Sequence, residues 1–138
     1  MSEKVFKIVG NYWKSDKCFP SLNDLLSEAC RNPKDYGRMK HSYENVVIDA
    51  VRTQIRGYKA NGKVMLDILW GEPKKTPHKR DEDNVIAGGR KIIHDALKTL
   101  GVIEDDNPDY IIFGRNKVLY TDDEPFIEVH IVEIEPMA

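Results

Sequence analysis

Long apolar runs and cysteines are both scarce in this chain of 138 residues, and each scarcity excludes a class of protein. No stretch approaches the ~18 consecutive apolar residues that a membrane-spanning helix needs, and the residues Met1–Lys4 do not resemble a signal peptide. The two cysteines, Cys18 and Cys30, lack metal-ligand spacing and suit a reducing compartment, as free thiols with a packing role. We therefore expect a cytoplasmic protein with no membrane partner.

Several catalytic motifs are absent as well. The chain has no GxxxxGK[ST] phosphate loop, no GxGxxG after a strand and no GxSxG elbow, which excludes the common nucleotide-hydrolase and serine-hydrolase classes. The four histidines share no ligand spacing, and we expect them at the surface or half-buried: His41, His78, His94 and His130. An excess of one charge is also missing, because the net charge is −2. Any site for a polyanion must therefore come from local clustering.

The length and the hydrophobic periodicity predict one α+β domain over residues 1–138, with helices packed on a small mixed sheet. The expected order is β-α-α-β-α-β-β, since two strands follow one another at the C-terminal end and no regular βαβ repeat is present. Strands are predicted at residues 5–9, 63–70, 110–113 and 126–134, and helices after Ser21, at 42–56 and at 83–100.

Local signals set the expected boundaries. Ser21 is predicted to cap the first helix, whose apolar face would comprise Leu22, Leu25, Leu26 and Ala29. Pro33 and Gly37 predict an exposed connection over residues 31–40. Gly101 is expected to end the third helix, and residues 71–73 to end the second strand.

A basic segment runs directly into a cluster of acids in the second half of the chain. Residues 74–80 (Lys-Lys-Thr-Pro-His-Lys-Arg) precede Asp81, Glu82 and Asp83, and a second acidic cluster, residues 104–106, follows a helix length later. Carboxylates brought together repel one another, so this adjacency favours a divalent cation between them and a polyanion along the basic residues. Carboxylate-held Mg²⁺ activates water and neutralises phosphate charge. The pattern indicates a metal-dependent enzyme that acts on nucleic acid.

Each part of this pattern also has a simpler explanation. Acids at the start of a helix commonly cap it and interact favourably with its dipole. Lys91 and Asp95 are spaced for an exposed i,i+4 ion pair. A basic stretch such as residues 74–80 is usually a solvated loop. These alternatives stay open for each feature by itself, and only their adjacency favours a site.

Five short motifs lie in order between residues 79 and 106. They are Arg80-Asp81-Glu82-Asp83-Asn84, Lys91, Asp95-Ala96-Leu97, Gly101 and Asp105-Asp106. Together they resemble the signature R-D-x-D-N … K-x-x-x-D-A-L … G … D-D of the RusA-type Holliday junction resolvases. That resemblance implies a Mg²⁺-dependent homodimeric endodeoxyribonuclease, with Mn²⁺ as a substitute, which resolves four-way DNA junctions by paired symmetric nicks in recombination and repair.

The resemblance also implies roles for particular residues. Asp81, Asp83 and Asp106 would hold the metal with Asp105 beside them, Lys91 would complete the catalytic set, and Asn84 would orient a carboxylate. The DNA-binding residues would be Lys74, Lys75, His78, Lys79, Arg80 and Arg90. This chain has four more residues between the acidic pair and the lysine than the founding type, which moves the lysine ~6 Å along a helix.

Two other functions remain as alternatives at this point. The longer spacing before Lys91 leaves room for a protein that binds branched DNA without cutting it. A metal-dependent phosphatase for a small substrate would also use the carboxylates, although a seven-residue basic run exceeds what a small ligand needs.

Overall fold

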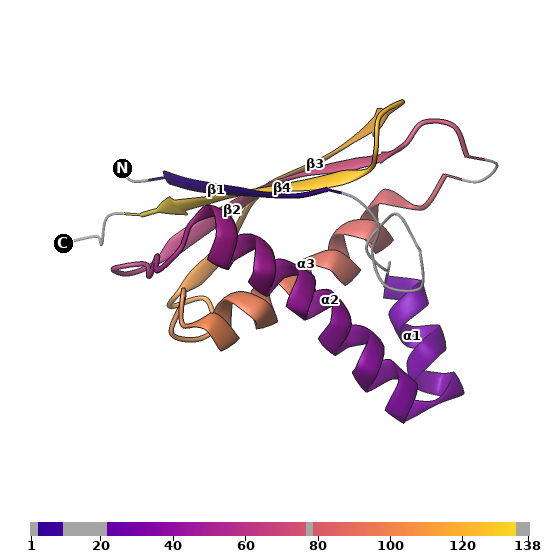
Figure 1. Ribbon diagram of the computed structural model, residues 1–138, viewed down its shortest axis with the longest axis horizontal. Helices are drawn as coiled ribbons and strands as arrows, with labels where there is room; N and C mark the ends of the chain where they lie inside the picture. Colours follow the sequence, from indigo (N-terminus) through magenta and orange to yellow (C-terminus); the bar gives the residue numbers. More distant parts are fainter. Residues whose placement is uncertain (1–2, 10–21, 77–78, 135–138) are drawn as a thin grey trace.

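The computed structural model describes residues 3–9, 22–76 and 79–134 and confirms the α+β architecture and the predicted order of elements. The four strands are β1 (Glu3–Val9), β2 (Val64–Pro73), β3 (Ile111–Thr121) and β4 (Phe126–Glu133), and the three helices are α1 (Leu22–Arg31), α2 (Pro33–Gln54) and α3 (Glu82–Leu100). Figure 1 shows the sheet edge-on, with the helices on one side of it.

The strands form one mixed sheet in the order β1-β4-β2-β3. β4 pairs antiparallel with both β1 and β2, whereas β2 and β3 are parallel and are connected through α3. The parallel register shifts between Leu66 and Ile68, which indicates an irregularity of the β-bulge type in this pair. Since β2 leads into α3, the carboxyl end of β2 and the start of α3 lie close together, which is where α/β units commonly bind ligands.

Alternation along the strands places one face of the sheet in the core. In β2 the buried apolar side chains are those of Val64, Leu66, Ile68 and Trp70. α3 packs closely above Trp70, because a Cβ built on Gly89 would lie 2.4 Å from the Trp70 ring. The indole Nε1 of Trp70 donates to Asn116 Oδ1 at 3.1 Å, so its polar group is satisfied inside the core.

The predicted exposed connection over residues 31–40 is wrong, because α2 begins at Pro33. Asn32 caps the helix, accepting from the backbone N–H of Lys34 at 3.0 Å, and proline is well tolerated in a first turn. Met39 is 7% exposed and belongs to the core, so this stretch is a packed helix. The sequence breakers Pro33 and Gly37 misled the prediction: one stands at a helix start and the other on an exposed helical surface.

Other boundaries and burial assignments also differ from expectation. β2 continues through residues 71–73, where the prediction ended it, and β3 extends to Thr121. Leu26 is 55% exposed and Cys30 is exposed and free, so neither has the expected packing role. The predicted cap Ser21 and Cys18 lie outside the described residues.

The outer edge of β1 is closed by a side chain at one point. The side-chain oxygen of Gln54 accepts a hydrogen bond from the backbone N–H of Lys7, and its side-chain nitrogen donates one to the Lys7 carbonyl. Both bonds measure 2.7 Å. This pair of bonds imitates a neighbouring strand and attaches the end of α2 to the sheet. Within the described ranges, none of the helices is long and apolar enough to cross a membrane.

Candidate functional site

The acidic pair lies at the N-terminal end of α3. Asp81 is the N-cap residue, with φ −62° and ψ 126°, and its Oδ1 accepts from the N–H groups of Asp83 at 2.9 Å and Asn84 at 3.4 Å. Asp81 and Asp83 are exposed, and Asn84 is half-buried. The interpretation of Asp81 as a capping acid is therefore correct. Asn84 interacts with the Asp81 carboxylate through its backbone N–H.

The basic segment is anchored by an ion pair that sequence reasoning missed. Glu72 is only 6% exposed at the end of β2, and it accepts from Arg80 Nε at 2.8 Å and Nη2 at 2.9 Å. Arg80 Nη1 also lies 3.6 Å from Asp24 of α1. Arg80 therefore connects β2 and α1 at the start of α3, a structural role in addition to the predicted DNA contact.

The remaining basic residues of this segment are more exposed. Lys74 and Lys75 are exposed, and the Lys74 ammonium lies 3.9 Å from Asp122. Lys79 Nζ lies 5.3 Å from the centre of the Tyr120 ring and donates to the Lys74 carbonyl at 3.1 Å. The predicted contact residue His78 lies outside the described residues.

A second cluster lies between α3, the loop after it and β3. A cavity of 210 Å³, here called the α3–β3 cavity, is lined by side chains that include Arg90, Lys91, His94, Asp95, Asp106 and Phe113. The structure thus brings Lys91 and Asp106 to one place, together with Arg90. Lys91 is exposed, whereas Arg90 is half-buried, and burial lowers the pKa of its guanidinium.

The predicted ion pair between Lys91 and Asp95 is wrong, because Asp95 binds another lysine. Lys40 Nζ of α2 lies 2.7 Å from Asp95 Oδ2, and Glu44 approaches the same ammonium at 3.7 Å. Burial lowers the pKa of Lys40, because it disfavours the charged ammonium. The hydrogen bond to Asp95 and the nearby negative charges together outweigh burial, so the pKa of Lys40 is raised. Lys91 therefore projects from α3 without Asp95 as its ion-pair partner.

Asp105 interacts mainly with its neighbours in the chain. Its Oδ1 accepts from the backbone N–H of Asp106 at 2.8 Å and from Lys98 Nζ at 3.1 Å. The bond from the Asp106 N–H lowers the pKa of Asp105 first, and Lys98 lowers it further. The bond to Asp105 correspondingly raises the pKa of Lys98. Asp105 is thus held in its ionised form at the rim of the site.

His94 is the member of the cavity that sequence reasoning misplaced. It is buried, at 8% exposure, although we expected surface or half-buried histidines. Desolvation, with help from the nearby Arg90 charge, lowers the pKa of His94 to about 4 despite the opposing carboxylates Asp95 and Asp106. The imidazole is therefore neutral at pH 7. His94 stands on the α3 face that packs on β3, and that contact is not visible in a local sequence pattern.

The acids at the start of α3 are separated along the helix from the residues of α3 that line the α3–β3 cavity. Asp83 precedes Lys91 by eight residues, which corresponds to about 12 Å along a helix axis. In residues 3–9, 22–76 and 79–134, no three or more His, Cys, Asp or Glu side chains are grouped to hold a metal ion. A metal ion shared by Asp81, Asp83 and Asp106 therefore stays a prediction, because the described geometry does not assemble it.

A more limited Mg²⁺ site fits the residues at the start of α3. Mg²⁺ retains several waters and is commonly held by one or two carboxylates together with phosphate oxygens of a substrate. Capping uses Oδ1 of Asp81, and the carboxylate of Asp83 is exposed beside it in the sequence. Mg²⁺ at these two acids, with phosphate oxygens as its further ligands, stays a prediction.

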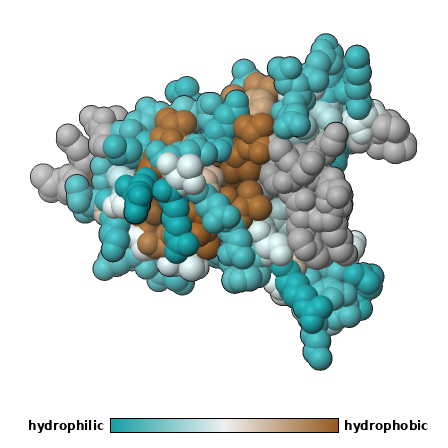
Figure 2. All heavy atoms as spheres, in the orientation of Figure 1, coloured by the Kyte–Doolittle hydropathy of each residue, from teal (hydrophilic) through white to brown (hydrophobic). Residues whose placement is uncertain are grey.

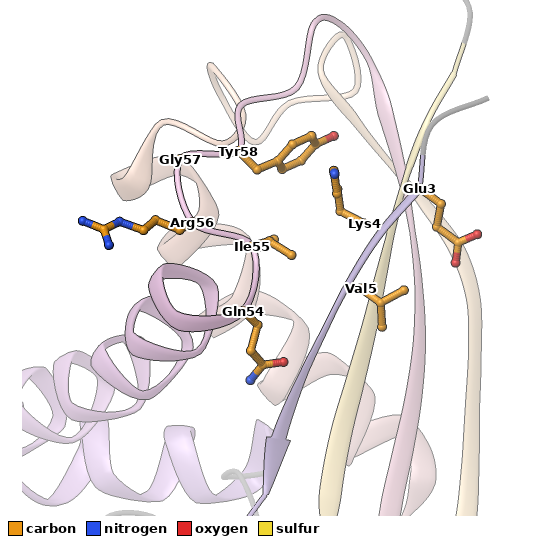
Figure 3. Close-up of a pocket in the computed structure, with 8 residues that line it drawn as sticks. All are labelled: Glu3, Lys4, Val5, Gln54, Ile55, Arg56, Gly57 and Tyr58. Carbon is orange, nitrogen blue, oxygen red and sulfur yellow. The ribbon is translucent and has the colours of Figure 1, made fainter.

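A larger cavity of 550 Å³ lies elsewhere, between the first residues of β1 and the segment after α2. Figure 3 shows the Lys4 and Tyr58 side chains extending toward one another, with Glu3 directed to the far side of the strand. Lys4 Nζ lies 5.9 Å from the Tyr58 ring centre. Burial, followed by the nearby Glu133, raises the pKa of Tyr58 to about 12. None of the predicted site residues lines this cavity.

Neither the surface of the molecule nor similarity to known proteins identifies a function for this site. Figure 2 shows hydrophilic residues over most of one face, with apolar ones gathered near its middle. No protein-family model matches the chain, and a search of curated proteins gave no match either.

Proposed function

We propose that the protein is a Mg²⁺-dependent, structure-selective endodeoxyribonuclease that resolves four-way DNA junctions. The observation that carries this proposal is that Lys91 and Asp106, from α3 and the loop after it, line one cavity beside Arg90. The same helix begins with Asp81 and Asp83, directly after the basic segment. The order of these residues along the chain supports the resemblance to RusA-type resolvases.

The residues of the chain supply binding and charge in this proposal. Lys74, Lys75 and Lys79 contact DNA phosphates, and such contacts are strongly salt-dependent. Asp81 and Asp83 would hold Mg²⁺, which would supply an activated water and offset phosphate charge. Lys91 stabilises the negative charge that develops on the phosphate.

The substrate also supports a proposal for the assembly. A four-way junction has approximate two-fold symmetry, and its resolution needs two symmetric nicks. A closed C₂ dimer presents two equivalent sites at a fixed separation. We therefore propose a homodimer, acting in the cytoplasm in DNA recombination and repair.

Cleavage of an end-labelled synthetic four-way junction tests this function. We expect paired symmetric nicks with Mg²⁺ and none with EDTA. Asp83→Asn should abolish the nicks while the junction still shifts on a native gel. Asp49→Asn, which removes an exposed acid from α2, is the matched control and should cut normally. Unchanged cleavage by Asp83→Asn, or no cleavage by the wild type, contradicts the proposal.

A branched-DNA-binding protein without cleavage is the second candidate. The separation of Asp83 from the cavity that contains Lys91 and Asp106 favours it, because a nuclease needs these groups at one phosphate. In that case the same experiment gives a shifted but uncut junction with Mg²⁺, and Asp83→Asn behaves as the wild type does.

A further inference from the structure

Phe113 is unusually exposed for a phenylalanine on a strand that faces a helix. It is 58% exposed in β3, on the side where Arg90 and His94 of α3 approach it. The guanidinium carbon of Arg90 lies 3.6 Å from the ring centre, and the His94 ring lies 5.5 Å away at an interplanar angle of 28°. The guanidinium of Arg90 therefore stacks on the Phe113 ring with the His94 ring nearby; these three side chains are here called the platform, and much of the phenylalanine is still in contact with water.

His94 has a polar atom that the fold leaves unsatisfied. Its Nε2 is buried and has no hydrogen-bond partner among the residues that the structure describes, and the side chain lines the α3–β3 cavity. A buried nitrogen of this kind is normally paired, because burial without a hydrogen bond is costly. Because Nε2 is out of contact with water, a group in the cavity can supply the missing bond only when the side chains that cover this atom move aside.

The size and charge of the cavity limit what can enter it. At 210 Å³ it has the room of about seven water molecules, by the ~30 Å³ that each occupies in the liquid. Of the charged residues that line it, Arg90 and Lys91 are cationic, Asp106 is anionic, and Asp95 already binds Lys40. The cavity therefore suits one small planar group with a hydrogen-bonding edge, attached to an anion outside.

We propose that the α3–β3 cavity binds a single unpaired nucleotide of branched DNA. Its base stacks on the pair formed by Phe113 and Arg90, its phosphate contacts Lys91, and its entry moves aside the side chains that cover His94 Nε2, which then forms a hydrogen bond with the base. Aromatic rings and guanidinium planes both stack with bases that have left the helix. The site selects branched DNA, because a base in a continuous duplex cannot reach it. This inference rests on the proposed function only in taking DNA as the partner.

Binding without cleavage tests the inference. Fluorescence anisotropy in EDTA should compare a labelled DNA duplex that has one unpaired nucleotide with the fully paired duplex of the same sequence. We expect the wild type to bind the first about tenfold more tightly, in line with the usual strength of base stacking on an aromatic side chain. Equal binding of the two duplexes by the wild type overturns the inference.

Variants show whether the platform causes the preference. Phe113→Ala should remove the preference and Phe113→Trp should retain it, whereas Leu26→Ala, which truncates a residue of similar exposure on α1, should leave it unchanged. His94→Phe should reduce the preference by removing the hydrogen bond. Thermal unfolding confirms that each variant is folded. A preference that survives in folded Phe113→Ala overturns the inference.

The binding and cleavage experiments distinguish failure of this inference from failure of the nuclease proposal. If the wild type cuts the four-way junction but shows no Phe113-dependent preference, the inference fails and the nuclease stands. If the preference is present and no junction is cut, the inference stands and the nuclease fails.

Discussion

Glu72 and Arg80 form a two-pronged ion pair that joins the end of β2 to the residue before the cap of α3. Its two bonds measure 2.8 and 2.9 Å, and the side chain of Glu72 is 8% exposed. The pair thereby fixes where the acids at the start of α3 lie relative to the sheet.

Glu72→Gln should lower the free energy of unfolding by about 1–3 kcal/mol, because it removes the charge from a buried pair with well-directed hydrogen bonds. Urea unfolding measures the change. Asp122→Asn is the matched control: its partner Lys74 lies 3.9 Å away, both side chains are about 60% exposed, and the expected change is below ~0.5 kcal/mol. Equal effects of the two substitutions would contradict the assigned role.

Gly89→Ala should destabilise the protein by about 1–3 kcal/mol, because its Cβ would meet the Trp70 ring at 2.4 Å and force α3 away from the sheet. Thermal and urea unfolding give the size. Gly37→Ala, in α2 with nothing within 4 Å of its added Cβ, should instead stabilise by about 0.5–1 kcal/mol. A stable Gly89→Ala protein would mean that α3 packs less closely than described.

His94 should make stability depend on pH between 6.5 and about 4. Burial lowers its pKa from 6.5 to about 4 in the folded state, so within this range the unfolded chain binds a proton that the folded protein does not. Stability from this group is complete above pH 6.5 and falls by about 3 kcal/mol as the pH reaches 4.

Urea unfolding at several pH values checks this prediction by comparing variants, because other groups titrate in the same range. His94→Gln should lose the slope that His94 contributes. His41→Gln, a change at an exposed position of α2, should keep the wild-type slope. Parallel pH profiles for wild type and His94→Gln would show that His94 is not desolvated.

His130 should have the opposite dependence. Its Nδ1 lies 2.5 Å from Glu3 Oε1 and its Nε2 lies 2.8 Å from Glu128 Oε2, and these bonds, that to Glu3 first, raise its pKa. The stabilisation is complete below pH 6.5 and is lost as the pH rises through the raised pKa. His130→Gln should destabilise by about 1 kcal/mol at pH 6 and by less at pH 9. A larger effect at pH 9 would refute the doubly bonded imidazolium.

Hydrophobic periodicity was sufficient to predict an element where its apolar pattern is strong and a residue clearly ends it. The predicted helix at 83–100 corresponds to α3, and Gly101 ends it in the left-handed conformation with φ 75°. The pattern failed where a breaker residue suits its place. Pro33 fits the first turn of α2. Gly114 lies inside β3, and the polar residues that follow Phe113 do not have the pattern of a strand, so the prediction ended there too early.

The site was predictable only for residues close together in sequence. The acids that cap α3 follow from the chain order, and Asp81 is where a cap was expected. The Glu72–Arg80 pair and the burial of His94 depend on elements that meet only after folding. No period or motif encodes such contacts, so the sequence alone did not reveal the partner of Arg80 and placed His94 near the surface.

The bonds between Gln54 and Lys7 also affect how molecules can associate. An open strand edge invites another chain to add a strand, and here the amide occupies that edge at the middle of β1. At the opposite border of the sheet, β3 presents the exposed cations Arg115 and Lys117. Growth of the sheet from one molecule into the next is therefore discouraged at both sides.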